Sequence, residues 1–203
     1  MDSNSCRMQT LGISDSTEHS ESRLKALFWP SVKSGADVDY LGTQGFWVCA
    51  FVAVFTLLTM SLQGRPILAV VLFLFFYLGG VGVRERSPFA AIIVFVFYAL
   101  DTLISVLLLF LATPWGMLVV RLFITALLLS NVRATWMAAT WKPDSEEAVL
   151  PPRLGEFWTD KIADQIPAKI WPKLRIPYYI FAPWVLLLSF AGVAVVLARS
   201  FRH

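Results

Sequence analysis

Hydrophobic residues in this chain are gathered into five long runs, separated by short polar segments. Runs of about 18 or more apolar residues with few charges are typical of transmembrane helices. Lipid offers no partner for backbone polar groups, so such runs must be helical. We therefore predict an all-α integral membrane bundle of about five transmembrane helices. The spans cover approximately Gln44–Leu62, Ile67–Val83, Phe89–Leu111, Trp115–Ala139 and Tyr178–Ala198.

The polar segments divide the chain into four regions. Residues 1–43 form a polar N-terminal tail that we expect to be mostly disordered. Within it, residues 21–29 form either a short surface helix or a frayed segment with a chance apolar triplet. Residues 44–141 form a four-helix transmembrane core, and residues 178–203 form the fifth span with a short C-terminal end. Between them lies a proline-rich cytoplasmic connector, residues 142–177.

The connector contains an amphipathic pattern followed by a basic segment. Apolar residues recur every four positions from Leu154 to Ile166, and Glu156, Asp160 and Asp164 form the opposite stripe. Basic residues and tryptophans next to a span suit an interface with anionic headgroups. We predict an interfacial amphipathic helix, with docking on a partner protein as the alternative. The predicted interfacial residues are Trp158, Lys169, Trp171, Lys173 and Arg175.

The distribution of basic residues predicts the orientation of the chain. The five-span topology places twelve lysines and arginines on the N-terminal side and three on the other. Because basic residues are enriched in cytoplasmic loops, we expect the N-terminus in the cytoplasm and the C-terminus outside. A bacterial inner membrane is the preferred location, with a eukaryotic internal membrane as the alternative. The net charge of +3 includes no basic patch with interleaved aromatics, so no nucleic-acid partner is expected.

Two charges lie deep in the third and fourth spans, Asp101 and Arg121. A charge at the bilayer centre costs about 2.5–3.5 kcal/mol, so we predict that they form an ion pair within the bundle. Three interpretations stay open: a polar pathway or small-ligand site, a structural clasp between helices, or an outward-reaching Arg121 beside a protonated Asp101. The helical period places further polar residues on the same faces, namely Tyr98, Thr102, Ser105, Thr125, Asn131 and Thr135.

Three glycines, Gly79, Gly80 and Gly82, end the second span. Glycines in a span allow close approach of neighbouring helices. They also loosen a helix before its loop, because glycine has low helix propensity. We favour the second interpretation.

Catalytic and metal-binding patterns are not found in the sequence. The two cysteines form no CxxC pair and no histidine lies in a span, so we expect no metal and no cofactor. The first functional hypothesis is a non-catalytic scaffold or accessory subunit that binds lipid, a protein partner or a second copy of the chain. One alternative is a small-solute transporter or channel component built around Asp101 and Arg121, and another is a lipid-modifying enzyme.

Overall fold

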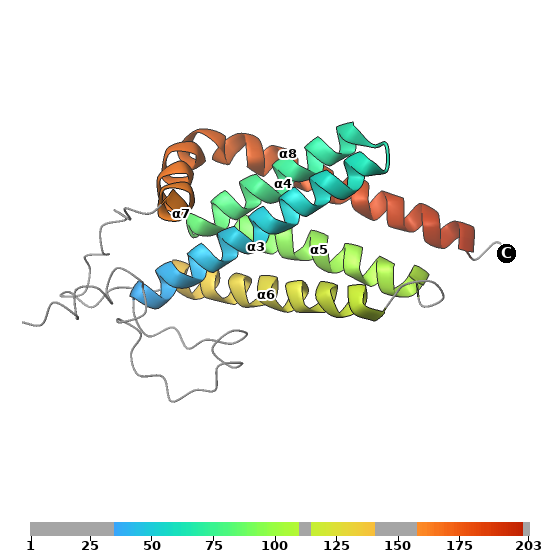
Figure 1. The fold of residues 1–203 in the computed structure, drawn as a ribbon, viewed down its shortest axis with the longest axis horizontal. Coiled ribbons are helices and arrows are strands. Elements are labelled where there is room, and N and C mark those ends of the chain that lie inside the picture. Colours follow the sequence, from blue (N-terminus) through green and yellow to red (C-terminus); the bar gives the residue numbers. More distant parts are fainter. Residues whose placement is uncertain (1–34, 110–114, 141–157, 201–203) are drawn as a thin grey trace, which may run out of the picture.

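The computed structural model describes residues 35–109, 115–140 and 158–200, which form helices joined by short turns (Figure 1). Within these residues, five helices are long and apolar enough to cross a membrane, which confirms the predicted all-α transmembrane bundle. The predicted tail helix over residues 21–29 lies outside the described residues. The elements are α3 (Gly35–Leu62), α4 (Pro66–Arg84), α5 (Pro88–Leu109), α6 (Trp115–Thr140), α7 (Trp158–Asp160), the π-helical turn η1 (Lys161–Gln165) and α8 (Ile166–Ser200).

The long helices run alternately in opposite directions (Figure 1). The α3–α4 turn, the start of α6 and the end of α8 lie at one end of the bundle, which we call the Arg65 end. The α4–α5 turn, the end of α6 and the short α7 lie at the other end, which we call the Arg84 end. Helix α3 packs along α4 and α6, while α8 packs along α4 and α5.

The two described turns between long helices follow from local sequence. Gly64 has a φ of +74°, a conformation that glycine adopts without steric cost. Pro66 then begins α4, at the position where its missing N–H is not needed. At the other end, the Ser87 hydroxyl accepts a 3.4 Å hydrogen bond from the Ala90 amide, and Pro88 begins α5. The predicted pattern of a turn or cap followed by proline is therefore found at both turns.

Two boundaries differ from the sequence prediction. Helix α3 begins at Gly35, nine residues before the predicted start of the first span. Helix α8 begins at Ile166 and continues to Ser200, so the expected break between connector and fifth span is not found. Three prolines lie inside α8, although each removes one backbone hydrogen bond. Packing against α4 offsets that loss, because Trp171 and Tyr178 are both buried in the common core.

The glycines at the end of α4 are sites of close helix approach, so the interpretation favoured from sequence is wrong. A Cβ on Gly80 would lie 2.7 Å from the Cys49 Cβ of α3. A Cβ on Gly82 would lie 2.5 Å from the Ala90 Cβ of α5 and 2.5 Å from the Trp171 ring of α8. Real Cβ atoms do not approach so closely. We call Gly79, Gly80 and Gly82 the glycine seam; α3, α5 and α8 all meet α4 along it.

Candidate functional site

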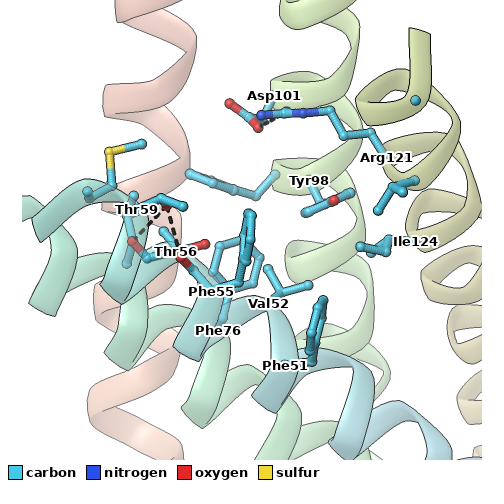
Figure 2. A pocket seen from close by; sticks show the side chains of 15 residues that line it. Phe51, Val52, Phe55, Thr56, Thr59, Phe76, Tyr98, Asp101, Arg121 and Ile124 are labelled. Atoms are coloured by element: carbon cyan, nitrogen blue, oxygen red, sulfur yellow. Dashed lines mark hydrogen bonds and ion pairs between the residues drawn. The ribbon is translucent and has the colours of Figure 1, made fainter. Parts of the chain in front are cut away.

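A cavity of about 420 Å³ lies between α3, α4, α5 and α6, toward the Arg65 end (Figure 2). This volume falls within the range of about 300–1,000 Å³ that is typical of small-molecule sites. Ten of its lining residues are labelled in Figure 2, and they come from all four helices. The cavity is thus built by the transmembrane core and not by a loop.

The polar part of the lining contains the predicted ion pair. Arg121 Nη1 donates to Asp101 Oδ2 at 2.5 Å, and the two side chains are 27% and 50% exposed. The pair therefore lies on the wall of the cavity and is less enclosed than the sequence interpretation expected. Asp101 is eight residues before Leu109 and Arg121 is six after Trp115, so both lie about 9–12 Å from the Arg65 end.

Two threonines of α3 line the same outer part of the cavity (Figure 2). Thr59 is three residues before the end of α3, and Thr56 is one turn deeper. The Thr59 hydroxyl donates to the Phe55 carbonyl at 2.9 Å, and its oxygen keeps acceptor capacity on the cavity side. The outer part therefore offers guanidinium and hydroxyl donors together with carboxylate and hydroxyl acceptors.

The deeper part of the lining is apolar and mostly aromatic. Phe51 lies eleven residues before the end of α3, or about 16 Å from the Arg65 end. Phe51 and Phe55 are 59% and 50% exposed, so this wall also faces the surroundings of the bundle. Opposite them stand Phe76 and Phe97, whose ring centroids are 5.5 Å apart. The cavity thus changes from polar to aromatic with increasing distance from the Arg65 end.

The predicted polar faces of α5 and α6 meet in part. Tyr98 is buried and lines the cavity below the ion pair. The Thr102 and Thr125 hydroxyls are 3.4 Å apart, which joins α5 to α6 next to the pair. Ser105 Oγ and Thr125 Oγ1 also donate to backbone carbonyls one turn back, those of Asp101 and Arg121.

The remaining two predicted polar residues lie elsewhere. Asn131 is buried beside Gly45 of α3, and the Thr135 hydroxyl donates to its carbonyl at 2.6 Å. Helix α6 packs against both α3 and α5, so its polar residues are divided between two neighbours. The expectation of one continuous polar face on α6 is therefore wrong.

A second ion pair, which sequence reasoning missed, joins η1 to the end of α4. The Arg84 side chain is 1% exposed, and its Nε donates to Asp164 Oδ1 at 3.0 Å and to the Ala163 carbonyl at 3.3 Å. Arg84 Nη2 also donates to Asp164 Oδ1. The sequence interpretation placed Arg84 in a charged loop and Asp164 on a solvent-facing stripe. Arg84 directly follows the apolar glycine seam, a position that already calls for a buried partner.

The predicted interfacial residues are divided between surface and core. Lys169, Lys173 and Arg175 are exposed on α8, and Trp158 is 73% exposed. Trp171 is 6% exposed and belongs to the core, which corrects its assignment as interfacial. Its ring fills the space that the missing Cβ of Gly82 leaves, and this site is available only because α8 begins before the predicted span.

These features define a multi-pass helical membrane protein with a cavity among four of its spans. Among the described residues, no group of three or more histidine, cysteine or acidic side chains is arranged to hold a metal ion. Comparisons with protein-family models, with curated protein sequences and with solved structures found no match to this chain.

Proposed function

We propose that this chain is a non-catalytic membrane protein that binds a membrane amphiphile in the cavity at Asp101 and Arg121. The polar head of the ligand contacts the ion pair and the α3 threonines, and its acyl chain lies among the phenylalanines. The observation that carries this proposal is the order of the lining, polar near the Arg65 end and aromatic toward the middle of the bundle. A lipid in the adjacent leaflet has the same order of polar and apolar parts.

The polar end must supply most of the selectivity. An acyl chain in the bilayer already has apolar surroundings, so it gains little hydrophobic free energy by entering the cavity. Hydrogen bonds are stronger in an environment of low dielectric constant, and a charged partner strengthens them further. Asp101 and Arg121 together carry no net charge. They therefore favour a head with both donors and acceptors, such as glycerol hydroxyls or a zwitterionic phosphate ester.

The alternative is a small-solute transporter or channel component that uses the same ion pair. The partial exposure of both charged side chains in the cavity is the observation that favours it. Flux of ions or amphiphiles through liposomes containing the purified chain would support this alternative, and amphiphile binding without flux would support the proposal above.

Filling the cavity is expected to abolish ligand binding. Thr56→Trp places an indole ring within the lining, where it competes with the acyl chain for space. In liposomes doped with a photoactivatable phospholipid, we expect cross-linking to residues 51–60 to fall at least about tenfold, as for loss of about 1.4 kcal/mol. The matched control is Val54→Trp, because Val54 is on the same helix, is 50% exposed and does not line the cavity. Equal labelling of the two variants would reject the cavity as the binding site.

A second variant separates binding from a purely structural clasp. Arg121→Gln removes the charged donor but keeps most of the side-chain volume. If the pair holds the head of a ligand, cross-linking falls while the free energy of unfolding changes by only about 0.6 kcal/mol, the usual contribution of one polar contact between membrane helices. A larger loss of stability with unchanged cross-linking would assign the pair to the clasp and would count against the proposal.

We also propose that the chain lies in a bacterial inner membrane with its N-terminus in the cytoplasm. The support is the excess of basic residues on the N-terminal side, twelve against three. In this orientation the cavity opens toward the outer leaflet. Reporters fused to the two termini of the full chain are expected to lie on opposite sides, with the C-terminal one outside. Two cytoplasmic termini would contradict both the orientation and the five-span topology.

A further inference from the structure

The first part of α8 extends beyond the length that a bilayer requires. Helix α8 has 35 residues, or about 52 Å at helical rise, whereas the hydrocarbon layer is about 30 Å thick. The apolar stretch of this helix ends at Gly192. Counting about 20 residues back from Gly192, as one span requires, reaches Lys173. The segment from Ile166 to about Arg175 therefore lies at the membrane surface of the Arg84 end.

Two lysines in this segment point away from the bundle. Lys169 and Lys173 are one helical turn apart and share one face. Trp171 and Tyr178, on the opposite face, are buried against α4 and α5. Both lysines are exposed. The packing of α8 thus fixes the direction in which the lysines face.

Arg175 stands beside them on a fixed aromatic support. Its guanidinium carbon lies 5.6 Å from the centroid of the Tyr179 ring, within the range of a cation–π contact. The Tyr179 hydroxyl is 2.9 Å from Ser87 Oγ, and its ring centroid is 4.5 Å from that of Phe89. This support reduces the freedom that the arginine loses on binding a ligand, and the planar guanidinium suits two oxygens of one phosphate group.

No acidic side chain balances these three cations within the apolar stretch from Ile162 to Gly192. The only acid in that stretch is Asp164, which is 16% exposed and paired with the buried Arg84. The buried ion pair therefore withdraws the one nearby carboxylate from the surface. The exposed apolar residues between the cations, Leu174 and Ile176, are suited to the adjoining acyl region.

We propose that Lys169, Lys173 and Arg175 form a binding surface for the phosphate headgroups of anionic phospholipids in the leaflet at the Arg84 end. This surface lies at the opposite end of the bundle from the cavity and does not depend on the proposed amphiphile site. Its ligands are selected by charge, whereas the ion pair in the cavity is neutral. A basic residue near an anionic surface contributes about 1 kcal/mol, which corresponds to about fivefold in binding per residue.

The test compares lipids retained by the full chain when it is purified from an equal mixture of phosphatidylglycerol and phosphatidylcholine. Native mass spectrometry is expected to show enrichment of phosphatidylglycerol on the wild-type chain, decreasing as salt is raised. In the triple variant Lys169→Gln/Lys173→Gln/Arg175→Gln this enrichment should fall at least about tenfold. The matched control is Arg65→Gln, which removes an exposed charge at the other end and should keep the enrichment.

Two further measurements keep this test decisive. Thermal stability in phosphatidylcholine alone should be the same for the triple variant and the wild type, because the three replaced side chains are exposed. The charge-conserving variant Lys169→Arg/Lys173→Arg should keep the enrichment. Equal retention of the two lipids by the wild type, or unchanged enrichment in the triple variant, would overturn the proposal. Cavity cross-linking by the photoactivatable phospholipid should be unaffected in either case.

Discussion

Replacing Asp164 by alanine is expected to lower the free energy of unfolding by about 3–5 kcal/mol. The variant leaves the Arg84 guanidinium, which is 1% exposed, without the carboxylate that accepts from its Nε and Nη2 atoms. A buried charge without a partner costs far more than the net contribution of the intact pair. The variant should also release η1 from α4, because this pair and the Ala163 carbonyl hold the two elements together. Equilibrium unfolding of the purified chain in detergent measures the change.

The controls for this experiment come from the same turn and the same pair. Gln165→Ala alters an exposed neighbour of Asp164 and should change stability by less than about 0.5 kcal/mol. The double variant Arg84→Met/Asp164→Leu replaces both charges by apolar side chains of similar size, and it should recover most of the loss. If Asp164→Ala and Gln165→Ala were equally mild, the pair would not be what holds η1 in place.

The spans could be predicted from the sequence because lipid makes local composition decisive. A backbone in hydrocarbon must bond within its own helix, so an apolar run of sufficient length specifies a helix without knowledge of its neighbours. The turns at Gly64–Pro66 and Ser87–Pro88 were predictable for a related reason, since their chemistry acts within a few residues. These signals are all local.

What could not be predicted depends on contacts between distant segments. Arg84 and Asp164 are 80 positions apart, and each alone resembles an ordinary surface charge. The three prolines of α8 predict breaks, but burial of Trp171 and Tyr178 against α4 keeps the helix continuous. Position along a chain does not show which neighbour a side chain will meet.

The candidate site was predictable only on one side. Asp101 and Arg121 lie at similar depths on antiparallel helices joined by a short segment, so their meeting follows from helical rise alone. The cavity also needs α3 and α4, whose phenylalanines and threonines look like ordinary lipid-facing residues in the sequence. Its lining therefore emerged only from the packing of four helices.

The glycine seam leads to the second large effect: Gly82→Ala is expected to destabilise the bundle by about 1–3 kcal/mol. The added methyl would lie 2.5 Å from both the Ala90 Cβ and the Trp171 ring, which belong to two different helices. The Ala90 Cβ is attached directly to the backbone of α5, so it can move away only if the helix moves. This cost exceeds the gain of about 1 kcal/mol that alanine brings to a helix interior.

A glycine of the same chain without neighbours supplies the matched control. Gly192 lies in α8, and no heavy atom outside its own helix backbone would come within 4 Å of an added Cβ. Gly192→Ala should therefore be neutral or stabilising by up to about 1 kcal/mol. Equilibrium unfolding in detergent compares the two variants, and opposite signs are expected. If Gly82→Ala stabilised the chain as much as Gly192→Ala, the close approach of α5 and α8 to α4 would be wrong, and the glycines would act only by loosening the end of α4.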